Sequence, residues 1–256
     1  MRIPTMAGTV ERRLLINYRV APDIVASLVP APFRPRLVHG AAVAGICLIR
    51  LGQLRPAGLP AAVGIRTENA AHRIAVEWDA APGQPPYTGV FIPSRLTASR
   101  TTAWLGGRLF PGAHHHARFT THEASRDLRV AFADRNDSGH LDVTVRIADA
   151  WPGSALFTDL DEASEFFRLG AAGYSPARDP HHLDGLELRT TAWHVQPATV
   201  THAASSFFDD PRTFPQGTAL LDTALVMRQL PVTWHALPPM PTTHATPVRR
   251  PVPSGP

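Results

Sequence analysis

Lysine is absent from this chain of 256 residues, so all 25 basic side chains are arginines. Without a side-chain amine, neither a Schiff-base lysine nor the phosphate-binding lysine of a Walker motif can form. The single cysteine, Cys47, excludes an internal disulfide and a cysteine-based zinc site. No apolar run approaches the roughly 20 residues of a membrane span, and the first residues lack a signal-peptide pattern. We therefore expect a cytoplasmic protein with no membrane partner.

The charge is modest and evenly spread. Acidic residues number 21, the net charge is +4, and both signs are interspersed along the chain. Because no basic stripe forms, we expect no nucleic-acid partner. The motifs of serine hydrolases, dinucleotide-binding enzymes, nucleoside triphosphatases and H-E-x-x-H zinc enzymes are absent. What remains is a set of histidines and arginines on expected strands.

Short apolar segments separated by proline and glycine favour strands. We expect strands at 9–20, 41–51, 65–78, 89–95, 114–123, 128–133, 141–147, 186–195, 199–208 and 232–237. Helices are expected after Pro22, over 97–105 and over 159–169, where Asp159 can cap the first turn and Gly170 ends the last. The pattern predicts one mainly β domain over 1–237, an antiparallel sheet closed into a β-barrel with a few short helices. The Pro-rich segment 238–256 is expected to be a disordered tail.

Three consecutive histidines open one expected strand. Alternation places His114, His116 and Arg118 on the same face. Two imidazoles on one face can exchange protons with a substrate near neutral pH. They can also hold a metal ion, with a third ligand from His72, His122 or Glu68. A solvated strand face without a function is the remaining interpretation, and we expect no cofactor.

Arg66 and Glu68 share a face of the expected strand 65–78, and alternation lets Arg95 lie beside them. An arginine inside a barrel needs an acid or an anionic ligand, because a buried unpaired charge is costly. The guanidinium fork accepts a carboxylate with two hydrogen bonds, so these residues are candidates for binding substrate. A structural ion pair of Arg66 with Glu68 or Glu77 is the alternative.

The segment 106–119, with the sequence GGRLFPGAHHHARF, resembles a signature of the YqjF-like family of unknown function, domain of unknown function 2071. Looser matches occur in the family's order at 20–30, 65–67, 89–91 and 193–197. That family is similar to the acetoacetate decarboxylase superfamily, whose fold is a closed antiparallel β-barrel around a ligand cavity. In the decarboxylases two lysines, the first of which forms the Schiff base, correspond to His114 and His115.

The resemblance implies that His114 points into a cavity, and that His116 and Arg118 follow by alternation. It does not imply decarboxylase chemistry, because an imidazole cannot form the iminium. We expect a protein that binds a small anionic or carbonyl-bearing organic molecule. As an enzyme it would be a lysine-independent lyase, isomerase or cyclase, with His114 and His116 exchanging protons while Arg66, with Arg118 or Arg95, holds a carboxylate or enolate. The alternatives are a non-catalytic binding or sensing protein and a His-ligated metal enzyme, and a homo-oligomer is left open.

Overall fold

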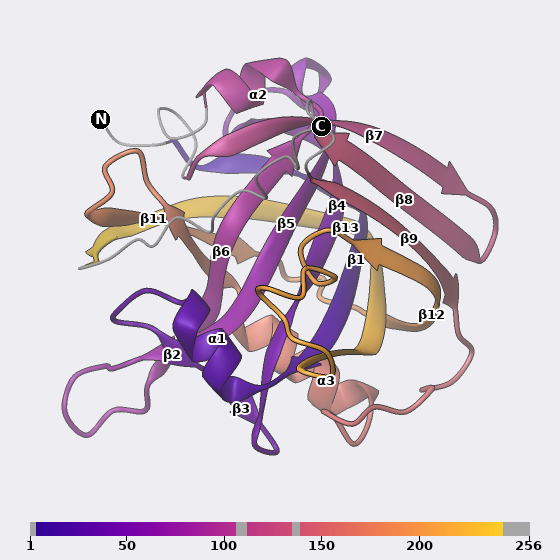
Figure 1. Ribbon diagram of the computed structural model, residues 1–256. Coiled ribbons are helices and arrows are strands. Elements are labelled where there is room, and N and C mark those ends of the chain that lie inside the picture. Colours follow the sequence, from indigo (N-terminus) through magenta and orange to yellow (C-terminus); the bar gives the residue numbers. More distant parts are fainter. Residues whose placement is uncertain (1–3, 106–111, 135–138, 243–256) are drawn as a thin grey trace, which may run out of the picture.

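Five long strands form the centre of the molecule. In the computed structural model, which describes residues 4–105, 112–134 and 139–242, these are β1 (Met6–Val20), β4 (Ala41–Pro56), β5 (Ile65–Trp78), β6 (Tyr87–Thr97) and β13 (Ala219–Pro241). Figure 1 shows them side by side in one strongly twisted sheet. Their residues are rich in Val, Ile and Leu, which pack well on a pleated surface. The strand predicted at 65–78 has the observed bounds of β5, and the other four are longer than predicted.

Shorter elements complete the fold. The remaining strands are β2 (Arg34–Pro35), β3 (Leu37–Val38), β7 (His114–Glu123), β8 (Asp127–Asp134), β9 (His140–Ile147), β10 (Ala172–Pro176), β11 (His182–Arg189) and β12 (Gln196–Ser205). The helices are α1 (Pro22–Leu28), α2 (Arg100–Leu105), α3 (Leu160–Leu169) and the 3-10 helix Ala61–Val63. The mainly β fold with a few short helices is confirmed. Among the described residues no helix is long and apolar enough to cross a membrane.

The strands pair into two closed rings that share the five central strands. One ring runs β13-β1-β4-β5-β6-β10-β11 and closes where β11 pairs with β13. The other leaves β6 through β7, β8, β9 and β12 and returns to β13. Two pairings, β6 with β10 and β6 with β7, are parallel rather than antiparallel. The chain from β6 to β7 passes through α2, which gives the crossover that a parallel pair requires.

Alternation along β1 separates two cores. Leu14 and Ile16 point into one core, which includes residues of β8 and β9 such as Val130 and Val143. Leu15, between them, packs in the second core with residues of α3. Both sides of the central strands are therefore covered, which explains why they read as near-continuous apolar runs.

Helix α3 follows its sequence signals. The Asp159 carboxylate accepts a hydrogen bond from the Glu162 backbone N–H at 2.8 Å, and the Glu162 carboxylate accepts one from the Thr158 N–H at 2.7 Å. This reciprocal cap fixes the start of the helix. Phe166 and Phe167 are buried on its inner side. Figure 1 shows α2 and α3 at opposite ends of the strands.

The sheet extends past the expected domain boundary. β13 continues to Pro241, whose partner in β11 is His182, and the Thr242 N–H donates to the His181 carbonyl. The first residues of the predicted disordered tail are therefore a paired strand. The rest of that tail, 243–256, lies outside the described residues. So do 106–111, within the family signature, and 135–138, in the predicted hairpin turn.

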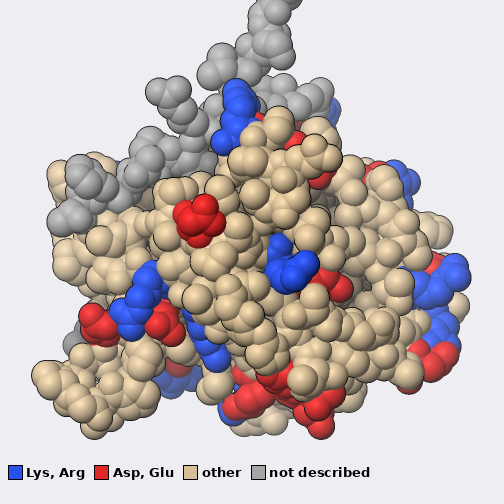
Figure 2. Space-filling view, turned by 60° about the horizontal axis from the view of Figure 1, so that its bottom comes forward, with Lys and Arg blue, Asp and Glu red and all other residues tan. Residues whose placement is uncertain are grey.

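Charged residues of both signs are interspersed on the surface. Figure 2 shows this on the end of the molecule that carries α3, where basic and acidic side chains alternate without one large basic area. Several exposed arginines pair with a near neighbour, as Arg168 does with Glu165 at 2.6 Å.

A candidate ligand-binding cavity

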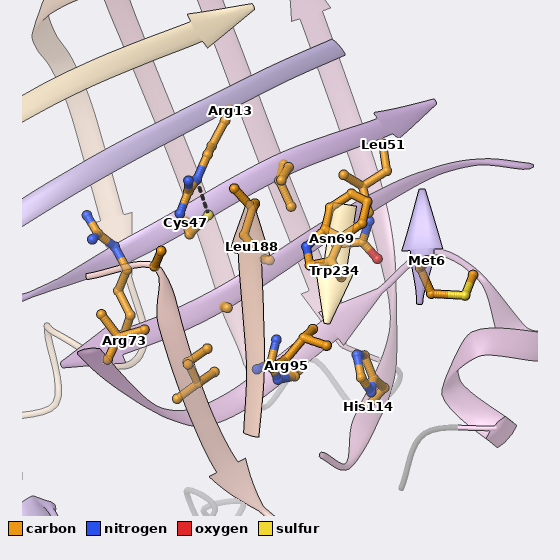
Figure 3. A pocket seen from close by; sticks show the side chains of 18 of the residues that line it. Met6, Arg13, Cys47, Leu51, Asn69, Arg73, Arg95, His114, Leu188 and Trp234 are labelled. Atoms are coloured by element: carbon orange, nitrogen blue, oxygen red, sulfur yellow. Dashed lines mark hydrogen bonds between the residues drawn. The ribbon is translucent and has the colours of Figure 1, made fainter. Parts of the chain in front are cut away.

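A cavity of about 190 Å³ lies within the first ring of strands. Each of the seven strands of that ring contributes at least one lining residue, and Thr102 of α2 and Phe167 of α3 add one each. The lining is mostly apolar, with Leu, Ile, Ala and Trp side chains. Its polar members include Thr102 and six residues labelled in Figure 3: Arg13, Arg73, Arg95, His114, Asn69 and Cys47.

No carboxylate side chain lines this cavity in the described part of the chain. Of the 21 acidic side chains, only Asp137 lies outside the described segments. The cavity wall therefore combines three guanidinium groups and a mostly apolar surface, with no acidic side chain among its described lining residues. Buried charges in proteins are normally paired, so this composition would suit an anion.

Arg95 reaches the cavity from the end of β6. Its Nε donates to the Ser175 hydroxyl of β10 at 2.7 Å, which fixes the side chain without neutralising its charge. Burial is the main cause that lowers the pKa of Arg95 to about 10, against the opposing effect of charge on Cys47 and Asp184. Arg95 remains a cation at neutral pH. Because its partner is a neutral hydroxyl, it keeps the capacity to bind an anion.

His114 is the neighbour of Arg95 on the next strand, since the two residues are partners in the parallel register of β6 and β7. The His114 Nδ1 lies 3.0 Å from the Gly112 carbonyl oxygen. A carbonyl only accepts, so Nδ1 carries the proton and Nε2 carries a lone pair. Burial, and then the charge of Arg95, lower the pKa of His114 to about 4. The imidazole is therefore neutral at physiological pH.

Gly112 sets the position of both groups. It has φ +79°, and a Cβ added there would lie 2.8 Å from the Ser175 Cβ. Glycine alone fits this backbone conformation and close approach. Its N–H donates to the Asp184 carboxylate at 2.9 Å, so the turn into β7 is tied to β11. The pair Gly112-Ala113 thus places His114 directly after a tight turn against β10.

Arg13 and Arg73 are the two arginines of the cavity wall that the sequence analysis missed. Arg13 comes from β1 and donates to the Cys47 sulfur at 3.2 Å, as Figure 3 shows. Arg73 comes from β5, donates to the Asn17 side-chain oxygen, and lies 4.6 Å above the Phe167 ring. Its odd-numbered face of β5 also carries Asn69 and Ala71. The available signal was alternation, but alternation does not tell which face of β5 is turned to a cavity.

Arg66 and Glu68 lie on the even-numbered face of β5 and do not line this cavity. Arg66 is mostly exposed and pairs with Glu11 at 2.6 Å rather than with Glu68 or Glu77. Glu68 accepts from buried Arg12 at 2.6 Å and pairs with Arg50. The structure therefore does not bring Arg66 and Glu68 together with Arg95 at this cavity: both belong to ion pairs outside it.

His116 and Arg118 are also not among the lining residues. His116 is half-buried beside Thr97, and its Nδ1 has no hydrogen-bond partner among the residues described. Arg118 is exposed further along β7. β7 pairs with β6 only over its first three residues and then runs beside β8, so alternation alone does not carry its later side chains into the cavity. In the described segments no three His, Cys, Asp or Glu side chains gather as a metal site, so the metal interpretation finds no ligand set there.

Several solved structures have this fold. An acetoacetate decarboxylase-like enzyme from Sphingomonas wittichii RW1 is 14% identical, with a TM-score of 0.55 over 92% of each chain. The acetoacetate decarboxylase of Legionella pneumophila is 13% identical, with a TM-score of 0.56 over 92% of this chain and 88% of its own. The enduracididine biosynthesis enzyme MppR, solved in complex with pyruvate, is 11% identical, with a TM-score of 0.57 over 94% and 91%. The fold is therefore of the acetoacetate decarboxylase type.

The family is defined more closely by the sequence. Residues 8–224 match the family DUF2071, described as an uncharacterized conserved protein. The chain belongs to this family, which confirms the resemblance carried by the segment 106–119. No curated protein matches the sequence. At the identities above, the solved structures establish the fold and not the reaction.

Proposed function

We propose that the protein binds a small organic carboxylate with a neighbouring carbonyl group, such as a 2-oxo acid, in the cavity of the first ring. The carrying observation is the cluster of Arg13, Arg73 and Arg95 in an apolar cavity lined by no carboxylate in the described part of the chain. A carboxylate would accept paired hydrogen bonds from a guanidinium and offset its charge in a low-dielectric space. MppR, which shares the fold, binds pyruvate.

Arg95 is the proposed carboxylate or enolate clamp. Its Nε is held by Ser175, and its two terminal nitrogens, which have no hydrogen-bond partner among the described residues, would bind the ligand. His114, its register partner, is the proposed acid–base group. With Nδ1–H directed to the Gly112 carbonyl, its Nε2 is the atom that would take a proton from the carbon beside the ligand's carbonyl. The C–H electron pair would pass into an enolate, whose oxygen Arg95 would stabilise.

The low pKa of His114 fits this scheme only when ligand is bound. Part of the lowering comes from the positive charge of Arg95. A carboxylate on Arg95 would offset that charge and raise the pKa of His114, so the base becomes stronger when substrate is present. The chemistry needs no lysine, and it includes isomerisation, cyclisation or dehydration through an enolate. Two roles remain predictions from alternation: His116 as a second proton-transfer group and Arg118 as a second cation. Neither residue lines the cavity.

A non-catalytic binding or sensing protein is the second candidate. One observation favours it: among the described residues the cavity wall carries one histidine, His114, and no carboxylate, and burial lowers the pKa of His114 to about 4. A reaction that takes a proton from one atom of the ligand and gives one to another atom would need a partner acid beside His114. Binding alone needs only the guanidinium groups.

A thermal-shift screen of small 2-oxo acids, 2-hydroxy acids and neutral ketones tests the proposal. We expect carboxylates to raise the melting temperature and the matching neutral ketones to have no effect, because binding to the folded state stabilises it by mass action. Arg95→Gln should abolish the shift, and Arg66→Gln, a matched change outside the cavity, should keep it. The proposal is wrong if neutral ketones bind as well as carboxylates, or if Arg95→Gln binds carboxylates as the unchanged protein does.

Turnover separates the two candidates. Each ligand found is incubated with the protein in deuterium oxide, and exchange of the hydrogens beside its carbonyl is followed by proton NMR. An enzyme that works through an enolate exchanges them faster than buffer does, and His114→Gln stops the exchange while the ligand still binds. Binding without exchange or product identifies the sensing protein.

A further inference from the structure

The cavity holds more positive charge than one carboxylate can balance. In Figure 3, Arg95 and His114 lie near each other, while Arg13, Cys47 and Arg73 lie toward the other side of the view. In the register of β5 and β6, Arg95 is opposite Ala71, and Arg73 follows two residues further along the same strand face. Two residues of a strand span roughly 7 Å. Arg73 therefore reaches the cavity at a different level from Arg95.

Within the described residues, the hydrogen-bond partners of Arg13 are sulfur atoms alone. Its Nε donates to Cys47 Sγ at 3.2 Å, and its Nη1 lies 4.0 Å from Met227 Sδ. A thiol and a thioether are weak acceptors compared with a carboxylate. The guanidinium is therefore held in place without being neutralised.

Arg73 is buried still more deeply, with 7% of its surface exposed. Its contacts are the Asn17 amide oxygen and the face of the Phe167 ring, both uncharged. The Arg73 Nε has no hydrogen-bond partner among the residues described. Burial lowers the pKa of this side chain to about 9, which still leaves it charged at neutral pH. A buried donor without a partner calls for an explanation, and a bound ion or water is one such explanation.

We infer that the cavity takes a ligand with two anionic groups, a short dicarboxylate, whose second carboxylate lies between Arg13 and Arg73. The inference rests on the proposed function, since it concerns the other end of the same ligand. The first carboxylate lies on Arg95 beside His114, and the apolar wall contacts the carbon chain between the two. A monocarboxylate would leave Arg13 and Arg73 without an anion, whereas a dicarboxylate supplies one at each end.

The test compares two ligands of equal carbon number, 2-oxoglutarate and 2-oxopentanoate, by isothermal titration calorimetry. We expect 2-oxoglutarate to bind at least about tenfold more tightly, the ratio that one charge-assisted hydrogen-bonded pair supplies. Arg73→Gln and Arg13→Gln should each remove most of that preference and leave 2-oxopentanoate binding nearly unchanged. Arg95→Gln should weaken both ligands. Arg146→Gln is the matched control, because Arg146 is exposed and pairs with Asp127.

Two variants keep the test meaningful if one fails to fold. Arg13→Gln loses only contacts to sulfur, so a cooperative unfolding transition is expected for it even if Arg73→Gln is impaired. Equal affinity for the two ligands, with both lost in Arg95→Gln, would overturn the second subsite and leave the proposed function intact. A preference for 2-oxoglutarate that survives in Arg13→Gln and in folded Arg73→Gln would overturn it too. If neither ligand binds the unchanged protein, the proposed function fails, and this inference fails with it.

Discussion

His72 is a histidine that the fold keeps neutral, and it provides a sharp test of the packing of β5. It lies on the strand face opposite Arg73, with its ring centroid 4.4 Å from that of Phe207. Only 8% of its surface is exposed, and its Nδ1 has no hydrogen-bond partner among the residues described. Burial lowers its pKa from 6.5 to about 4. Protonation is therefore easier in the unfolded chain than in the folded protein.

The sign and size of the effect follow from that difference. Because the unfolded chain takes up the proton first, the free energy of unfolding is highest above about pH 6.5 and falls as the pH drops toward 4. The whole shift corresponds to about 3 kcal/mol, of which about 2 kcal/mol is lost between pH 7 and about pH 4.5. His114, whose pKa is lowered to about the same value, adds a second loss in the same range.

Urea unfolding followed by circular dichroism at several pH values measures the effect. We expect His72→Leu to lose about 2 kcal/mol less than the unchanged protein between the two pH values. His194→Leu, at an exposed histidine, serves as the control and should keep the original pH dependence. If His72→Leu loses as much stability on acidification as the unchanged protein, His72 is not buried in its neutral form and the described packing of β5 is wrong.

Three further substitutions test other parts of the structure by the same unfolding measurement. Arg12 is 1% exposed and is held by the carboxylates of Glu68 and Glu123. Glu68→Gln removes one of them and should lower the free energy of unfolding by about 3 kcal/mol. A loss below about 1 kcal/mol would show that Glu123 alone is sufficient. Asp159→Ala removes the N-cap of α3 and should cost about 1 kcal/mol, so an unchanged midpoint would contradict the cap. Gly112→Ala meets both a positive φ and the Ser175 Cβ at 2.8 Å; it should cost about 1–3 kcal/mol and weaken carboxylate binding, and a variant with full stability would refute the tight approach of β7 to β10.

Much of the fold could be predicted because its signals are local. β5 has the predicted bounds, and Asp159 caps α3 through the carboxylate that the sequence indicated. Proline and glycine between strands mark most of the connections. The parallel pairing of β6 with β7 could not be predicted in the same way, because it depends on how the crossover through α2 returns to the sheet. That pairing is what brings His114 next to Arg95.

The cavity was predictable only in part. The resemblance placed His114 at a cavity, and the structure gives it a place in the cavity wall. Arg66 and Arg73 look alike in the sequence, since each lies within the predicted strand 65–78. Period-two alternation sorts the residues of β5 into two faces, but which face turns inward depends on how the ring closes through β10 and β11. The even face holds the ion pairs of Glu68, and the odd face carries Arg73.

The absence of lysine gives the cavity its chemical character. In a fold shared with acetoacetate decarboxylases, this chain carries an imidazole at its cavity and uses arginine for every cation. Arginine stays charged when buried, whereas lysine loses its proton more readily in an apolar site. Without lysine the cavity cannot form a Schiff base with a carbonyl, and its cations are guanidinium groups.

A crystal structure of the protein with 2-oxoglutarate tests the central claim most directly. The account predicts the ligand inside the first ring of strands, with carboxylate oxygens about 2.7–3.2 Å from the terminal nitrogens of Arg95 and the carbonyl-bearing carbons beside His114. A ligand bound outside the cavity, or one inside it with both carboxylates turned away from every guanidinium, would contradict the account.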